Sequence, residues 1–116
     1  MIQVKRVYDK RGKDEIRSIL VDRLWPRGIS KEKSRWDEWI KDVSPSDELR
    51  KWFKHEPEKW NEFRKRYKNE LTSKKEALIR LKSIEKEYGT LTLLYSAKNE
   101  ELNNAVALKE ILDKME

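Results

Sequence analysis

Two clusters of polar and cationic side chains directly follow apolar segments, and their residue types suit the binding of an anion. The first cluster is Asp22 and Arg23 with Arg27, which come after the apolar residues 19–21. The second covers residues 95–99, after the last apolar segment. Arginine binds phosphate or carboxylate through two parallel hydrogen bonds, and lysine adds a point charge. If the clusters meet in the folded chain, they predict a cationic pocket for a phosphorylated or nucleotide-like small molecule.

Several residues of these clusters also have a structural explanation. Asp22 and Arg23 could form an internal ion pair, and the hydroxyl of Tyr95 could have a purely structural partner. Trp25 fits loop packing better than stacking on a ligand, and Lys98 fits a solvated loop lysine equally well. With these structural alternatives left open, the expected ligand contacts are Arg23, Trp25, Arg27, Ser96 and Lys98 from the two clusters, and Asn103 from the segment that follows.

Candidates for catalysis are few, and the sequence does not decide whether the protein is an enzyme. His55 is the only histidine and a weak candidate for proton transfer, although capping the helix that follows it is the commoner role. Asp22 and Tyr95 are the other weak candidates. The chain has no Gly-rich phosphate loop, nucleophile elbow or paired-carboxylate motif. Reaction and substrate stay open.

Composition excludes several kinds of chemistry. The chain has no cysteine, which excludes disulfides, thiol catalysis and thiolate metal sites, and a single histidine makes a zinc site unexpected. No segment approaches the roughly 20 apolar residues of a membrane span, and no signal-peptide pattern stands at the N-terminus. We therefore expect a cytoplasmic protein without membrane association. The abundance of Lys and Glu is also typical of thermophilic proteins.

The net charge of +6 is concentrated in the first third of the chain. Residues 1–35 hold eleven Lys and Arg against five Asp and Glu, whereas residues 36–116 hold seventeen of each. A solvated basic face is the simpler explanation of such an excess, and the alternative is attraction of an anionic ligand, either a phosphorylated small molecule or a nucleic-acid backbone. An alternative function is thus a nucleic-acid-binding module. A third is an interaction protein with exposed Trp36 and Trp39 as its contact patch.

Three segments have the apolar pattern of strands. Residues 2–7 alternate between apolar and polar, residues 19–21 form a short apolar run typical of a buried strand, and residues 90–95 give the clearest strand pattern. The long segment between the second and third strands favours a parallel pairing of those two. The first two strands could instead form a hairpin, which the sequence leaves open.

The remaining chain has the spacing of helices. Trp36, Trp39 and Ile40 suggest a short amphipathic turn, and Ser44 with Pro45 suggests the start of a first helix. A second helix is expected from Pro57. A third is expected from a Ser73–Glu76 capping box to Gly89, and a last one after residues 96–99, with its free N–H groups facing an anion. Together these patterns predict one α/β domain over residues 1–116, with a small, largely parallel sheet of about three strands and about four helices packed on it.

The same segments resemble the YeaO-like proteins, a bacterial and archaeal domain family of unknown function. The resemblance rests on residues 6–9, 19–28, 37–39, 45–50 and 91–98, and above all on the string Val-Asp-Arg-Leu-Trp-Pro-Arg-Gly at 21–28. It supports the fold class and the cytoplasmic location and implies no particular reaction. Longer relatives have a Cys near the end of the last strand and a Cys-His-Arg string in the next helix. The corresponding places here are Tyr95 and residues 103–105, so the resemblance implies that such thiol or metal chemistry is absent.

Overall fold

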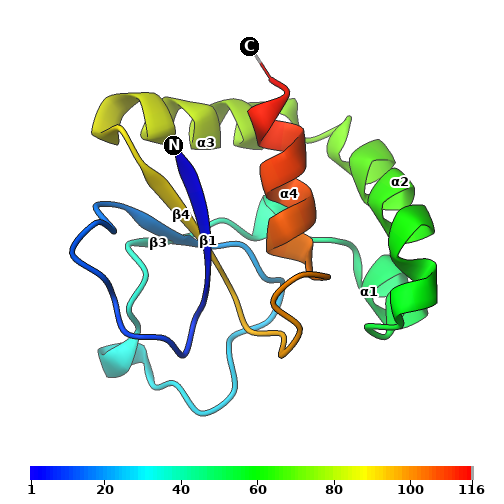
Figure 1. Ribbon diagram of the computed structural model, residues 1–116, viewed down its shortest axis with the longest axis horizontal. Coiled ribbons are helices and arrows are strands. Elements are labelled where there is room, and N and C mark those ends of the chain that lie inside the picture. Colours follow the sequence, from blue (N-terminus) through cyan, green and yellow to red (C-terminus); the bar gives the residue numbers. More distant parts are fainter. Residues whose placement is uncertain (116) are drawn as a thin grey trace.

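The computed structural model describes residues 1–115, and its centre is a parallel β-sheet (Figure 1). Within this range the sheet has four strands in the order β1-β4-β2-β3. Their bounds are Ile2–Arg6 for β1, Ser18–Leu20 for β2, Glu38–Trp39 for β3 and Leu91–Tyr95 for β4. All neighbouring pairs are parallel. The carboxyl ends of all four strands therefore lie along one edge of the sheet.

Strand β4 lies at the centre because it is apolar on both faces. All five of its residues are buried, and it pairs with β1 on one side and β2 on the other. The α/β class and the parallel sheet expected from the sequence are confirmed. The first two strands do not form a hairpin, since β4 lies between them. The helical turn expected around Trp39 is wrong: this residue belongs to β3, a fourth strand held to β2 by backbone pairing.

Four α-helices follow the order expected from the sequence. They are α1 (Asp47–Phe53), α2 (Trp60–Leu71), α3 (Lys75–Tyr88) and α4 (Asn104–Asp113). Short 3-10 turns cover Lys31–Lys33, Lys41–Val43 and Pro57–Lys59. Gly89 ends α3 in the left-handed conformation, with φ of 80°, as its position predicted.

Two predicted helix starts are wrong. Ser46, not Ser44, caps α1 by accepting a hydrogen bond from the Leu49 N–H at 3.1 Å. The Ser73–Glu76 capping box does not form, because the Ser73 hydroxyl donates to the Glu70 carbonyl in the preceding helix. At α1 two serines compete for the capping role, and the local pattern cannot choose between them, whereas α3 begins after Lys74 without a side-chain cap.

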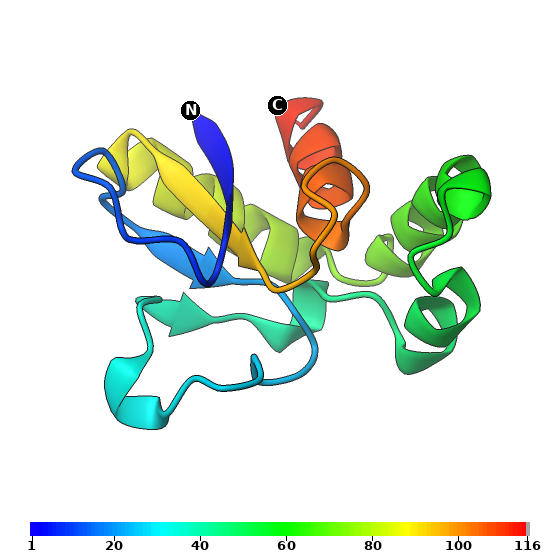
Figure 2. The same ribbon diagram turned by 60° about the horizontal axis from the view of Figure 1, so that its bottom comes forward.

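The two faces of the sheet are covered in different ways (Figure 2). Helices α3 and α4 pack on one face, where the main core gathers Ile19, Leu93 and Tyr95 with helical residues such as Leu81 and Leu108. The irregular segment between β2 and β3 covers the other face, where Leu20 and Leu94 are buried. The fold is thus a sheet with a single helical layer.

Trp36 and Trp39 contribute to the cover of the face without helices, and Trp25 packs on them. The Trp25 ring meets the Trp36 and Trp39 rings edge-on, with centroids 4.8 and 5.7 Å apart. Trp36 and Trp39 are half-buried and pack against Leu20 and Leu94. They therefore form part of the core, and the exposed contact patch considered for them is not present.

Much of the N-terminal positive charge is paired internally. The buried Glu15 carboxylate binds Arg35 and Lys5 and accepts hydrogen bonds from the Ser18 hydroxyl and the Gly12 N–H. Burial alone would raise the pKa of Glu15, but these donors outweigh it and hold the pKa at about 2. This ion-pair cluster ties the loop between β1 and β2 to the body of the protein.

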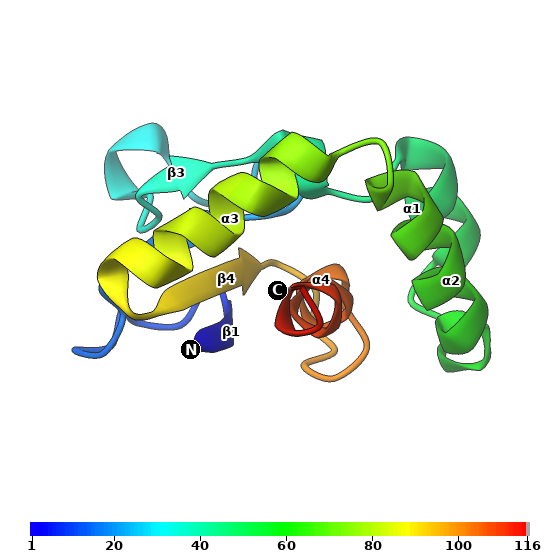
Figure 3. The same cartoon turned by 90° about the horizontal axis from the view of Figure 1, so that it is seen from above.

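Helices α1 and α2 lie beside the carboxyl-terminal edge of the sheet (Figure 3). They pack against each other, and Phe53 of α1 stacks on Phe63 of α2 with ring centroids 4.3 Å apart. This helical pair faces the loops that leave β2 and β4. Among residues 1–115, no helix combines the length and apolarity needed to cross a membrane.

Candidate functional site

A pocket of about 750 Å³ lies between the carboxyl-terminal edge of the sheet and the α1–α2 pair. We call it the strand-end pocket. Its walls come from residues after β1, β2 and β4 on one side and from α1, the α1–α2 connection and α2 on the other. The lining residues are Arg6, Tyr8, Asp22, Arg23, Leu24, Trp25, Pro26, Arg27, Pro45, Arg50, Phe53, His55, Phe63, Ser96, Ala97, Lys98, Asn99 and Asn104. The structure thus brings together two clusters that are about seventy residues apart in the sequence.

Asp22 holds the two sheet-side walls together. One carboxylate oxygen accepts hydrogen bonds from the Ser96 N–H at 3.0 Å and the Ser96 hydroxyl at 2.7 Å. The other accepts a 3.0 Å bond from the side-chain amide of Asn104. These three donors occupy both oxygens, so Asp22 connects the loop after β2 to the loop after β4 and to the start of α4.

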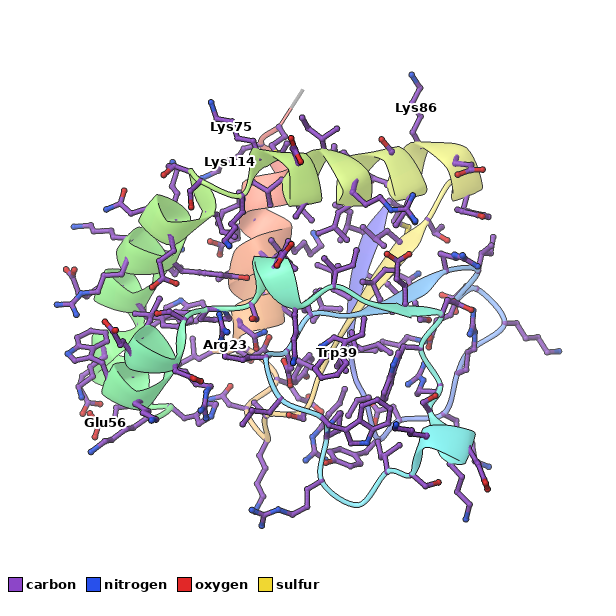
Figure 4. All side chains as sticks on the ribbon, turned by 180° about the vertical axis from the view of Figure 1, so that it is seen from behind. Arg23, Trp39, Glu56, Lys75, Lys86 and Lys114 are labelled. Carbon is purple, nitrogen blue, oxygen red and sulfur yellow. The ribbon has the colours of Figure 1, made fainter. Side chains whose placement is uncertain are left out.

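The strand-end pocket is lined by five cationic side chains and, among the described residues, by one carboxylate, that of Asp22. Arg27 is exposed, and its side chain makes no hydrogen bond or ion pair within the described residues. Arg23 uses only its Nε, which donates to the Pro45 carbonyl at 2.9 Å, and Figure 4 shows it in the space between the sheet and α1. Its two terminal nitrogens therefore remain free of hydrogen bonds to residues 1–115. Lys98 is also exposed and without an ion pair in that range.

The other two cations, Arg6 and Arg50, are not among the residues expected from the sequence. Arg6 ends β1 and donates to the carbonyls of Ala97 and Ser96, so it braces the loop after β4. Arg50 lies on α1 and pairs with Asp47 at 3.1 Å. The sequence does hold a signal for Arg6, because a strand parallel to β4 must end at the same edge. No local pattern could have placed Arg50 there.

Aromatic rings form the other part of the lining. Trp25 lines the pocket while its indole N–H donates to the Ile29 carbonyl, which fixes the ring. Tyr8 lies under the guanidinium of Arg6, 4.6 Å from its ring centroid. Phe53, His55 and Phe63 contribute from the α1–α2 side. A ligand in this pocket would therefore meet both positive charge and ring surfaces.

Two of the sequence candidates lie outside this pocket. Asn103 is buried and is the N-cap of α4, where its side-chain oxygen accepts from the Val106 N–H at 3.0 Å. Helix α4 starts only at Asn104, so it does not directly follow residues 96–99 as expected. Tyr95 lines a separate hollow with Glu100 and Asp9. Burial, together with those two carboxylates, raises the pKa of its phenol.

The catalytic candidates from the sequence that line the strand-end pocket are Asp22 and His55. Both oxygens of Asp22 accept hydrogen bonds from protein donors, one of which is the Ser96 hydroxyl at 2.7 Å. His55 lines the pocket without any hydrogen bond to residues 1–115, so no group orients it as a base. Nowhere in that range do three or more His, Asp or Glu side chains gather in a way that could hold a metal ion.

Comparison with known proteins finds one matching family and several relatives. The family described as the inactive DUF488-N3 subclade matches residues 1–115, a range that includes every residue lining the strand-end pocket. The Escherichia coli uncharacterized protein YeaO is 48% identical over 111 residues, which are 96% of each chain. The Mycobacterium tuberculosis uncharacterized protein Rv3073c is 49% identical over 70 residues, which are 60% of this chain and 59% of that protein. No solved structure matches the chain significantly.

Proposed function

The chain belongs to the inactive DUF488-N3 subclade, and from this premise we propose that it binds a phosphorylated or nucleotide-like small molecule in the strand-end pocket without transforming it. The ligand would lie at the carboxyl-terminal edge of the parallel sheet, which is where open α/β sheets commonly bind their ligands. Arg23 and Arg27 would bind its phosphate, and Lys98 would add positive charge.

The observation that carries this proposal is the availability of the two arginines. Other arginines of the N-terminal third are engaged elsewhere: Arg11 with Asp37, Arg35 with Glu15. Among residues 1–115, no group hydrogen-bonds to the terminal nitrogens of Arg23, and the carboxylate nearest to its Nε, that of exposed Asp47, is 4.0 Å away. Arg27 has no carboxylate partner within the described residues. Guanidinium groups that line a concave surface without a hydrogen-bonded carboxylate are suited to bind an anion through two parallel hydrogen bonds.

Binding without catalysis is supported by two further points. The subclade is described as inactive, and the resemblance to the YeaO-like proteins puts Tyr95 and residues 103–105 where longer relatives have Cys and Cys-His-Arg. In this chain Asn103 caps a helix and Tyr95 faces a different hollow. The replaced positions therefore supply no nucleophile to the strand-end pocket.

Calorimetric titration with nucleoside monophosphates tests this proposal. We expect Arg23→Ala with Arg27→Ala to weaken binding by about 100-fold, because each charged hydrogen-bonding group contributes roughly 1.5 kcal/mol or more. Arg66→Ala with Arg80→Ala is the matched control, since it removes the same charge from two exposed arginines outside the pocket. An equal loss in both double variants, or no binding by the wild type to any phosphorylated compound, would contradict the proposal.

Nucleic-acid binding by the N-terminal third is the alternative function, and the same variants separate it from the proposal. A phosphate backbone is held by many distributed charges, so its binding would fall steeply with added salt. Gel-shift assays with DNA and RNA at two salt concentrations would reveal this. Salt-sensitive binding that survives Arg23→Ala with Arg27→Ala would favour the alternative over a small-molecule pocket.

A further inference from the structure

The connection between α1 and α2 has an unusual backbone. Lys54 and His55 both adopt the left-handed conformation, with φ of 50° and 57°, although neither is glycine. Within residues 1–115 they are the only non-glycine residues with positive φ. The turn is fixed by backbone hydrogen bonds from Lys54 to Arg50 and from Glu56 to Phe53. Residues with a β-carbon are disfavoured in the left-handed conformation, because the β-carbon comes too close to the backbone. This backbone strain is often retained where the side chain has a function.

A structural role explains Lys54 but not His55. Lys54 ends α1 as its C-cap, a position where a left-handed residue is common. His55 caps neither neighbouring helix, and its imidazole makes no hydrogen bond within the described range. Glycine would adopt this conformation without strain. The chain instead has an imidazole at this position, where it lines the strand-end pocket.

The imidazole also lies beside a pair of stacked aromatic rings, with its plane tilted by 56° from that of Phe53. Its ring centroid lies 5.8 Å from that of Phe53, which itself stacks on Phe63. Phe53 and Phe63 are buried, whereas His55 is exposed at the end of this row. The α1–α2 side of the pocket thus ends in an accessible ring, and the sheet side carries the guanidiniums of Arg23 and Arg27.

We propose that the ligand is a nucleotide whose base contacts the ring of His55 while its phosphate faces Arg23 and Arg27. This inference rests on the proposed function and narrows it from phosphorylated compounds to those with a heteroaromatic base. His55 would thereby set the specificity of the pocket, because a planar base gains from stacking and a sugar phosphate does not.

Calorimetry with adenosine 5′-monophosphate and ribose 5-phosphate tests the inference on wild type, His55→Gly and Lys54→Gly. We expect the wild type to prefer the nucleotide by about tenfold, the contribution typical of one stacked base. His55→Gly should lose this preference and bind both ligands as the wild type binds ribose 5-phosphate. Lys54→Gly should keep it. Both variants should raise the melting temperature by about 2–5 °C, because glycine relieves the left-handed strain.

The outcomes separate the two proposals. Equal binding of both ligands by the wild type, or an unchanged preference in His55→Gly, would overturn the role of His55 and leave the phosphate site standing. Failure of the wild type to bind either ligand would overturn the phosphate site and this inference together. A melting temperature that rises in both glycine variants shows that any loss of preference in His55→Gly does not come from misfolding.

Discussion

Replacing Glu15 with glutamine is expected to lower the free energy of unfolding by about 3 kcal/mol, the cost of removing one partner from a buried ion pair. The Glu15 side chain has no exposed surface, and its carboxylate binds Arg35 and Lys5. Glutamine keeps the shape but leaves both cations without their partner, and Arg35 is itself only 13% exposed. Urea denaturation measures the change. Glu87→Gln, at an exposed position, is the control and should have little effect.

The pH dependence of stability provides a second measurement on the same residue. The folded pKa of Glu15 is about 2, below the value of 4.5 for a free glutamate. Its contribution is therefore fully present above about pH 5 and is lost as the pH falls from there towards 2, because the unfolded chain takes up the proton first. We expect the stability difference between wild type and Glu15→Gln to shrink over this range. A difference that stays constant down to about pH 2 would contradict the assigned role.

Replacing Asp22 with alanine is expected to weaken anion binding although it removes the only carboxylate that lines the strand-end pocket among the described residues. Electrostatics alone predicts the reverse, since losing a negative charge should favour an anion. The structure predicts a loss of anion affinity, because Asp22 accepts hydrogen bonds from the Ser96 N–H, the Ser96 hydroxyl and the Asn104 amide. These bonds keep the walls of the pocket in place. We expect the free energy of unfolding to fall by about 2–3 kcal/mol as these donors lose their acceptor. Urea denaturation and calorimetric titration measure the two effects.

Asp47→Ala is the matched control for this experiment. Asp47 is exposed, pairs with Arg50 at 3.1 Å and lies 4.0 Å from Arg23, yet it does not join the walls of the pocket. Removing the Asp47 carboxylate should leave the anion affinity unchanged or raise it modestly, because Arg23 and Arg50 then have no carboxylate competing with the ligand. If Asp22→Ala instead binds the anion more tightly than wild type, then Asp22 acts only through its charge and the structural explanation is wrong.

The α/β class can be predicted because the strongest patterns lie in the strands that matter most. Residues 91–95 are apolar throughout apart from one threonine, which fits a central strand buried on both faces, and this is where β4 lies. Strand β3 escapes such a prediction because it has only two residues, and the spacing of Trp39 suggests a helical turn instead. A strand of two residues forms only because it pairs with the backbone of β2, and such pairing cannot be predicted from the local sequence.

The candidate site can be predicted in part, because two of its walls directly follow strands that the sequence indicates. Loops that follow neighbouring parallel strands meet at one edge, so Asp22, Arg23, Arg27 and Lys98 come together because β2 pairs with β4. The sequence gives that pairing only as an expectation. Asn103 lies outside the pocket because the start of α4 depends on its capping bond to Val106. The contribution of α1 and α2, including Arg50 and the ring of His55, depends on how the helical pair packs beside the sheet.

Taken alone, the sequence determined the chemical inventory of this protein: an apolar strand core, an excess of cations in the first third, no thiol and one imidazole. These are properties of residue type and local period, which hold whatever the fold. Tertiary structure alone decided which cations stay available. Glu15 and Asp37 bind Arg35 and Arg11, whereas Arg23 and Arg27 reach the strand-end pocket without a hydrogen-bonded carboxylate among the described residues. The physical reason is that ion pairing depends on distances of a few ångströms between residues far apart in the chain, and only folding sets those distances.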